Sequence, residues 1–379
     1  MFKHQNYSWI ELQKRYIFII VILIEFFCVN PYIEAKSVYV FPWWKIFSSD
    51  EEFFVENPAG GYASIAIPLR DALNKLGHQL HAVSSLHDLY TADYVATFHY
   101  PADYEPQVMQ CLESLPSEKL LLYIWETPIY MLSAYDKNRH QYFSKIFTWS
   151  DFWVDNVKYF KFVYPSLKAP MRRDLIPFNA RKLCTLVAHC RTSSHYGELQ
   201  TQRNNIVSFF ERKHPQDFDV YGQWWPSTYK TYRGPAGNKL DLLNHYKFYI
   251  CYENSAFSGY ITEKIFDCFY SGCIPVYLGA PDIDNYIPSS CYIDRRLFAS
   301  DQDLYKFLKN MPEDLYQAYL ANIQEFLKSD EAFLFSTEYF VHSFISAIFP
   351  EYDKDLVFTK EQQDRLAKMR ACIKVCPTY

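Results

Sequence analysis

Residues 246–281 read YKFYICYENSAFSGYITEKIFDCFYSGCIPVYLGAP and change their periodicity twice. The run KFYICYE (247–253) is continuously apolar, which predicts a buried strand, and the following ENSAFSG is a polar turn. Residues 261–270 then have the period of a helix, which ends at Gly272 before a second buried strand, CIPVYLG (273–279). A buried strand, a helix and a second buried strand in this order predict a parallel βαβ unit.

Similar strands and helices are predicted on both sides of this unit. Strands are expected at 38–41, 79–83, 93–99, 119–125, 145–149, 161–165, 182–188 and 218–222. Helices are expected at 62–76, 104–115, 198–212 and 239–246. Buried strands separated by helices form a parallel sheet that is covered by helices on both faces.

The predicted elements fall into two groups, because three prolines between residues 164 and 181 interrupt the periodicity as an interdomain linker would. We therefore expect an α/β chain with two Rossmann-like domains (37–165 and 181–345), joined by a linker (166–180). A tail with a short apolar segment (1–36) precedes them, and a C-terminal helical segment (346–379) packs back on the first domain. Two facing α/β domains create a cleft outside the carboxyl ends of their strands.

Composition excludes some classes of ligand. The chain has 379 residues and a formal net charge of -5, so no global field attracts nucleic acid. The ten cysteines are scattered, without a His/Cys cluster at zinc spacing. Asp282 and Asp284 follow a turn in which Asp is simply favoured, and we do not interpret them as metal ligands. We expect no nucleic-acid partner and no metal bound by the protein.

An apolar run, YIFIIVILIEFFCV, occupies residues 16–29 and is interrupted by Glu25. A spanning helix needs ~20 residues, so a membrane anchor, a cleaved signal and a buried core helix all remain open. The anchor is favoured, because Lys14 and Arg15 precede the run and would hold the N-terminus in the cytoplasm. We therefore predict a membrane-associated protein with a single-pass N-terminal anchor and its body across the membrane.

The start of the helix in the quoted stretch is a candidate site for a nucleotide diphosphate. Thr262 and Glu263 lie in its first turn, where backbone N–H groups without partners favour an anion such as phosphate. Lys264 adds a full positive charge, and Glu263 suits hydrogen bonds from ribose hydroxyls. For TEK alone, the alternative is a surface ion pair with a capping role that contributes ~0.3–0.5 kcal/mol.

The whole stretch resembles the signature of the α-1,3/4-fucosyltransferases, glycosyltransferase family 10, which reads FxxENS, a short turn and then YxTEKxxxxxxxGxxPVxxGAP. The matching residues are Glu253, Asn254, Ser255, Tyr260, Thr262, Glu263, Lys264, Gly272, Pro275, Val276, Gly279, Ala280 and Pro281. The similarity is weaker over 181–298 and, through WETP and FSKIFTW, in the first half. This resemblance implies the GT-B architecture, with an acceptor-binding first domain and a second domain that binds GDP-fucose.

The resemblance also implies roles for individual residues. Glu126 in IWETP resembles the family's proposed general base, and it directly follows a predicted strand, at a carboxyl end where site residues are expected. Arg203 and Lys264 resemble the pair that binds the diphosphate. Tyr260 would border the guanine, and Asn254 would orient the turn or bind donor hydroxyls. Glu253, Thr262 and Glu263 complete the predicted donor site.

One loop departs from the family pattern, and one aromatic cluster leaves two interpretations open. Where relatives have a Ser-Asn pair after the first strand of the donor domain, this chain reads LVAHCRTSSH (186–195), which places His189 and Cys190 in that loop. In addition, the aromatic cluster YGQWWP (221–226) suits either sugar stacking or packing in the core.

We thus expect an inverting fucosyltransferase that moves L-fucose from GDP-β-L-fucose to a hydroxyl of an oligosaccharide or glycoconjugate, with α-1,3 linkage to N-acetylglucosamine or glucose favoured. The alternatives are a GT-B transferase for another nucleotide sugar and an inactive glycan-binding relative. No cofactor is required, although a divalent cation could stimulate transfer without being bound by the protein. As in family members, a eukaryotic protein would be a type II Golgi protein; a bacterial one would lie at the inner membrane or its cytosolic face.

Overall fold

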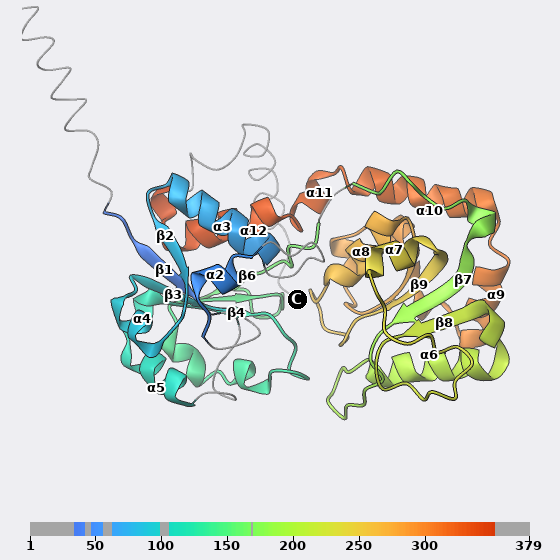
Figure 1. Cartoon of the computed structure of the whole chain (residues 1–379), viewed down its shortest axis with the longest axis horizontal. Coiled ribbons are helices and arrows are strands. Elements are labelled where there is room, and N and C mark those ends of the chain that lie inside the picture. The colour runs from blue at the N-terminus through green and yellow to red at the C-terminus, as the bar shows by residue number, and fades with distance from the viewer. Residues whose placement is uncertain (1–33, 42–46, 56–62, 99–105, 168–169, 353–379) are drawn as a thin grey trace, which may run out of the picture.

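The protein is described here by a computed structural model that covers residues 34–41, 47–55, 63–98, 106–167 and 170–352. Two α/β domains lie side by side, each built around one sheet (Figure 1). The paired strands are parallel throughout the described residues, as the alternation of apolar runs and helical segments predicts. The predicted α/β class with two Rossmann-like domains is confirmed.

The first domain contains a six-stranded sheet in the order β2-β1-β3-β4-β5-β6. Its strands are β1 (Ser37–Val40), β2 (Gln79–Ala82), β3 (Tyr94–Thr97), β4 (Leu120–Ile124), β5 (Lys145–Thr148) and β6 (Tyr159–Lys161). Its helices are α2 (Asp50–Phe53), α3 (Ala63–Lys75), α4 (Leu86–Thr91) and α5 (Pro106–Ser114). Every residue of β4 is buried, because helices cover both faces of this central strand.

The second domain contains a five-stranded sheet in the order β11-β10-β9-β7-β8. Its strands are β7 (Lys182–Val187), β8 (Phe218–Tyr221), β9 (Tyr246–Tyr252), β10 (Ile274–Leu278) and β11 (Ile293–Asp294). Its helices are α6 (Gln200–Lys213), α7 (Lys239–Asn244), α8 (Glu263–Ser271), α9 (Asp301–Lys309), α10 (Glu313–Phe326) and α11 (Asp330–Phe333). The strand order reverses between β7 and β9, and such a switch point opens a crevice at the carboxyl ends of the two strands.

The predicted βαβ unit is β9, α8 and β10. Gly272 ends α8 in the left-handed conformation, with φ of 62°, which glycine adopts without steric cost. The chain can therefore turn within two residues into β10, which pairs with β9 from Ile274 to Leu278. This short connection places the first turn of α8 beside the end of β9.

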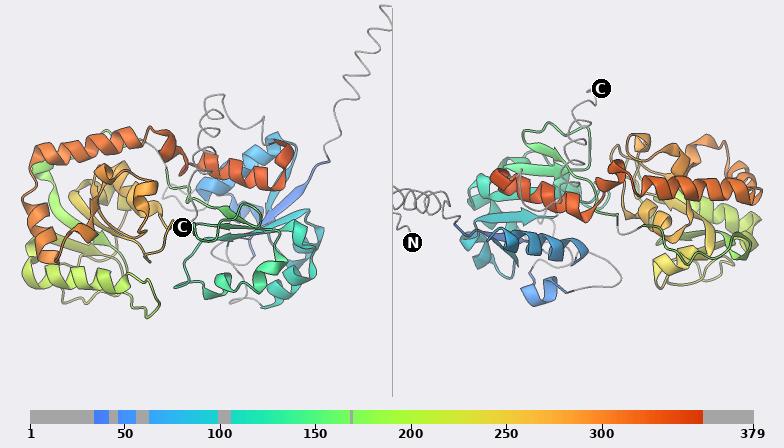
Figure 2. Two further views of the ribbon diagram at one scale, coloured as in Figure 1. Left: turned by 180° about the vertical axis from the view of Figure 1, so that it is seen from behind. Right: turned by 90° about the horizontal axis from the view of Figure 1, so that it is seen from above.

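Helix α12 (Thr337–Ile348) returns the chain to the first domain, where it packs against α3 (Figures 1 and 2). Phe340 and Phe344 of α12 join the aromatic core around Tyr123 of β4. The predicted boundary at residue 346 is therefore too late, because the returning segment already begins at Thr337. The helix predicted from residue 360 lies outside the described residues.

The described residues contain no helix that is long and apolar enough to cross a membrane. The apolar run at 16–29, which is the predicted anchor, lies outside them. The structure therefore leaves the predicted membrane association untested.

Aromatic and charged side chains join the two domains beside the β9–α8 turn. The Tyr260 ring of this turn packs edge-on against Trp149 and Tyr164 of the first domain, with ring centroids 5.1 and 5.8 Å away. Nearby, the Tyr286 hydroxyl of the second domain donates to Asp151 of the first at 2.5 Å. These contacts join the loops that follow the strands of the two sheets.

Replacement of Gly259 tests this contact between the domains. Gly259 has φ of +78°, and a Cβ there would lie 2.2 Å from the Trp149 carbonyl oxygen of the first domain. We expect Gly259→Ala to lower the free energy of unfolding by about 2–4 kcal/mol, through left-handed strain and overpacking together. Chemical denaturation measures this change, with Gly237→Ala as control because nothing lies within 4 Å of a Cβ at Gly237. Equal stability of the two variants would contradict the interpretation of the contact.

Candidate active site

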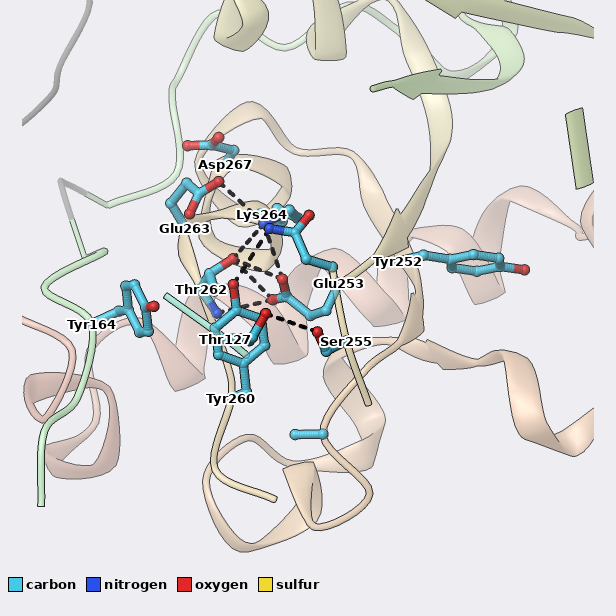
Figure 3. A network of polar contacts seen from close by, with 12 residues as sticks. Thr127, Tyr164, Tyr252, Glu253, Ser255, Tyr260, Thr262, Glu263, Lys264 and Asp267 are labelled. Atoms are coloured by element: carbon cyan, nitrogen blue, oxygen red, sulfur yellow. Dashed lines mark hydrogen bonds and ion pairs between the residues drawn. The ribbon is translucent and has the colours of Figure 1, made fainter. Parts of the chain in front are cut away.

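A buried polar network lies at the carboxyl end of β9, next to the switch point (Figure 3). At its centre is Glu253, the residue after β9, whose side chain is fully buried. Its carboxylate accepts hydrogen bonds from the Thr262 backbone N–H at 2.9 Å and from the Thr262 hydroxyl at 2.9 and 3.0 Å. Glu253 therefore binds the residue that precedes the first turn of α8 and fixes the position of this helix.

Lys264 supplies the positive charge of the network. Its Nζ lies 3.0 Å from Glu253 Oε2, 2.9 Å from Thr262 Oγ1 and 3.5 Å from Glu263 Oε1, and its side chain keeps 15% exposure. Burial alone would lower the pKa of Lys264, but the carboxylates of Glu253 and Glu263 outweigh burial and raise it. The ammonium group is therefore charged at neutral pH and partly accessible from solution.

The acidic partner of Lys264 at the surface is also charged. Glu263 is the first residue of α8, and its side chain is half exposed. Burial works against ionisation of Glu263, but Lys264 and Lys239 lower its pKa to about 2. The prediction placed a phosphate at the start of α8, whereas the structure already has the Glu253 carboxylate bound to the Thr262 amide there. An incoming phosphate must therefore approach Lys264 from its exposed side.

Arg203, on α6, brings a second cation to the end of β9. It is 5% exposed, and its Nε donates to the carbonyl oxygen of Tyr252, the last residue of β9, at 3.2 Å. Its Nη1 lies 3.5 Å from Gln200 Oε1. Within the described part of the chain no carboxylate forms an ion pair with Arg203, so its charge is not neutralised by the protein itself. A buried cation of this kind favours an anionic ligand.

Glu126 approaches this network from the first domain. It follows Trp125 at the end of β4, and the Tyr135 hydroxyl donates to its backbone carbonyl at 2.7 Å. Its Oε2 atom is buried and has no hydrogen-bond partner among the described residues. Burial raises the pKa of Glu126, the Lys264 charge lowers it, and Glu263 and Glu253 raise it further. The unpaired oxygen is free to accept a proton from a bound hydroxyl.

Two direct hydrogen bonds connect the loop of Glu126 to the second domain. The Ser255 hydroxyl donates to Thr127 Oγ1 at 3.0 Å, and Gln200 Nε2 donates to the Tyr130 hydroxyl at 2.8 Å. Figure 3 shows Thr127 and Ser255 directly beside Glu253 and Thr262. The structure thus places Lys264 close enough to both Glu126 and Arg203 for their charges to interact, although the three residues come from different elements. Their roles in binding and catalysis stay predictions.

Tyr260 and Asn254 both contact other groups of the protein in this structure. Tyr260 is only 2% exposed and packs between the two domains, so its ring has no free face for a guanine to stack on. The Tyr260 ring therefore cannot stack on a guanine in this conformation, and its place at the border of the nucleobase stays a prediction. Asn254 donates to the Tyr260 hydroxyl at 3.5 Å, and its carbonyl accepts the Leu199 N–H at 3.0 Å. Asn254 thus orients the turn, which was one of its two predicted roles.

The two aspartates after the second strand of the unit bind groups of the protein. Asp282 accepts the Gly259 N–H at 2.9 Å, and Asp284 accepts the Tyr292 hydroxyl. Across the described ranges, no group of three or more His, Cys, Asp or Glu side chains is placed to hold a metal ion. The cations that the protein itself places at the end of β9 and the start of α8 are Arg203 and Lys264.

Sequence reasoning assigned no role to four residues that hold the site together. Ser255 and Thr127 lie within the quoted motifs, and their hydroxyl character was the available signal. Gln200 and Tyr130 had no comparable signal, because their hydrogen bond joins residues 70 positions apart. Such contacts become visible only when the two sheets are placed together.

Comparison with known proteins agrees with this geometry. Residues 176–341 match the family model described as glycosyltransferase family 10 (fucosyltransferase), C-terminal part. This segment, a little under half of the chain, is thus similar to the C-terminal part of the family 10 fucosyltransferases. It contains α6, β9 and α8, and thus every predicted donor-binding residue, whereas Glu126 lies outside it.

Similar sequences carry fucosyltransferase names. Alpha-(1,3)-fucosyltransferase C of Drosophila melanogaster is 31% identical over 170 residues, which cover 41% of this chain and 37% of that protein. The 4-galactosyl-N-acetylglucosaminide 3-alpha-L-fucosyltransferase 9 of Mus musculus is 37% identical over 86 residues, or 22% of this chain and 24% of the mouse protein. The chain therefore matches well under half of the length of these relatives.

Solved structures share the fold over most of the chain. An alpha1,3-fucosyltransferase superposes with a TM-score of 0.55 and 15% identity, over 87% of this chain and 95% of that one. The T4 phage BGT, solved with its UDP-glucose substrate, superposes with a TM-score of 0.51 and 10% identity, over 83% of this chain and 99% of the phage protein. The chain thus has a GT-B-like fold, as predicted.

Removal of the central carboxylate tests the network. We expect Glu253→Ala to lower the free energy of unfolding by about 3–5 kcal/mol, because Lys264 and the Thr262 amide would be left buried without their partner. Denaturant titration measures the loss. The matched control is Glu325→Ala, which removes an exposed carboxylate 2.8 Å from Lys328 and should cost about 0–1 kcal/mol. Similar losses in the two variants would contradict the central role of Glu253.

Proposed function

We propose that this protein is an inverting fucosyltransferase that moves L-fucose from GDP-β-L-fucose to a hydroxyl of a glycan. The observation that carries the proposal is the unpaired Glu126 carboxylate beside the cations of a family 10 domain. We favour α-1,3 linkage to N-acetylglucosamine or glucose. The names of the relatives support fucose as the transferred sugar, and one of them supports α-1,3 linkage to N-acetylglucosamine.

In the proposed reaction, Glu126 accepts the proton of the acceptor hydroxyl. The hydroxyl oxygen forms a bond to C1 of fucose from the face opposite the diphosphate, and the bond between C1 and the phosphate oxygen breaks. The bonding electron pair leaves with GDP, so the β-linked donor gives an α-linked product. The raised pKa of Glu126 makes it a stronger base than an exposed carboxylate, and general-base catalysis contributes typically ~10²–10⁴-fold in rate.

The leaving GDP gains negative charge in this step. Arg203 has no carboxylate partner among the described residues, and Lys264 keeps an exposed side, so both can stabilise the β-phosphate. The fixed cations need no reorganisation at the moment of reaction. We therefore propose transfer without a cofactor, with a divalent cation at most as an activator from solution.

Turnover and binding together test the proposal. The purified protein should release GDP when it is given GDP-fucose and N-acetyllactosamine, and GDP should bind more tightly than UDP or CMP in calorimetric competition.

Glu126→Gln should reduce transfer by about 10²–10⁴-fold and leave GDP binding unchanged, because the amide keeps the shape but cannot accept the proton. A well-folded protein without transfer to any member of a broad glycan panel would overturn the proposal, and loss of GDP binding in Glu126→Gln would assign a structural role to this residue.

The pH dependence of the rate provides a second test. Because burial raises the pKa of Glu126, kcat/KM should fall on the acidic side at a pH above the ordinary carboxylate range. The Glu263 charge contributes to this raised pKa, so Glu263→Gln should move the acidic limb to lower pH. Glu263 cannot itself produce the limb, since its own pKa is about 2. A limb that stays in place or moves to higher pH in this variant would contradict the role of Glu126.

A further inference from the structure

The loop after β8 is fastened to the loop after β7, close to the candidate site. The Cys190 N–H donates to the Gln223 carbonyl at 3.0 Å, and the Gln223 N–H donates to His189 Nδ1 at 2.9 Å. The Trp225 indole is buried, and its Nε1 donates to the Ala188 carbonyl at 2.7 Å. Trp225 is thus the core residue of the YGQWWP cluster, and it holds the loop in place.

Trp224, the other tryptophan of this cluster, faces solvent. Its side chain is 61% exposed, and its φ is +67°. A bulky residue in the left-handed region is strained, and the exposed part of a large apolar ring adds no compensating burial. Packing therefore does not explain why a tryptophan occupies this position. Strained residues that a rigid loop holds in place are typical of ligand-binding positions.

A histidine and an arginine lie beside the exposed indole, and the arginine also contacts the first domain. The His189 ring centroid lies 4.9 Å from that of Trp224. The Arg191 guanidinium lies 5.1 Å from the Trp224 ring and 5.6 Å from the ring of Tyr130, which belongs to the first domain. Arg191 is exposed, and no acidic side chain forms an ion pair with it in the described ranges. Its donors therefore remain available to a ligand.

This cluster adjoins the proposed base. Tyr130 lies four residues after Glu126 in the loop that follows β4, and its hydroxyl is held by Gln200 at the start of α6. The proposed diphosphate cations lie at the end of β9, whereas Trp224 follows β8. A ligand that has one hydroxyl at Glu126 would therefore extend past Tyr130 toward Trp224.

We propose that Trp224, together with Arg191 and Tyr130, forms a platform for a pyranose ring of the glycan acceptor. Rigid aromatic side chains provide a large contact area at low entropic cost, and the C–H face of a sugar ring offers a flat apolar surface to an exposed indole. The Arg191 guanidinium donates to hydroxyls at the edge of the same ring. This inference rests on the proposed function and names the surface that binds the acceptor.

Trp224→Ala and Trp224→Phe test the platform with N-acetyllactosamine as probe. We expect Trp224→Ala to raise the acceptor KM about 10-fold with little change in kcat, and Trp224→Phe to retain most of the affinity. GDP affinity and the slow hydrolysis of GDP-fucose without acceptor should not change. The control is Tyr90→Ala on α4, because Tyr90 is a similarly exposed aromatic residue, at 58%. An unchanged acceptor KM would overturn the inference, and so would a loss of GDP affinity, which would assign Trp224 to the donor.

Calorimetry with GDP and N-acetyllactosamine separates this inference from the proposed function, because it needs no turnover. Binding to the wild-type protein that is about 10-fold weaker in Trp224→Ala supports the platform even if no transfer occurs. No binding to the wild-type protein, or equal binding to both, overturns it.

Thermal unfolding adds a second readout: Trp224→Gly should melt a few degrees above Trp224→Ala, because only glycine relieves the strain at φ of +67°. Equal melting temperatures would contradict the strain on which the inference rests.

Discussion

The ion pair between Glu253 and Lys264 is the interaction on which the rest of the site depends. Glu253 is fully buried at the end of β9, and its carboxylate is bound by Thr262 and Lys264 at the start of α8. A buried charge without a partner costs several kcal/mol, so neither residue can move without the other. This pair therefore fixes the angle at which α8 leaves the sheet and keeps one cation at the switch point.

The same cation sets the chemistry of the opposite domain. Burial and two neighbouring carboxylates raise the pKa of Glu126, and the positive charge of Lys264 opposes them. A diphosphate bound at Lys264 would add negative charge and weaken this lowering effect. Glu126 would then hold a proton more strongly when the donor is present than when it is absent. In the proposed reaction, donor binding and base strength are thus coupled through one ammonium group.

Local patterns in the sequence predicted the elements well and the contacts between domains poorly. The strand expected at 247–253 is β9, and the helix expected at 261–270 is α8, because a continuous apolar run and a helical period are local properties. The start of α12 was missed because an apolar helix face fits either core equally well. The burial of Tyr260 was missed for a related reason, since its ring packs on residues more than 90 positions away in the sequence. The proximity of Glu126 to Lys264 was predicted from family resemblance and not from the pattern.

The burial of Tyr260 shows that a motif can carry structural and chemical residues side by side. Within ten residues of the quoted stretch, Glu253 anchors a helix, Ser255 binds the loop of the proposed base, and Tyr260 fills the contact between the domains. All three residues lie on the connection between β9 and α8, and this connection contacts the other domain through Ser255 and Tyr260. A substitution in this segment would therefore disturb helix position, base position and domain contact together. The proposed recognition of the acceptor, by contrast, uses the loops after β7 and β8, and the loop after β7 departs from the family pattern.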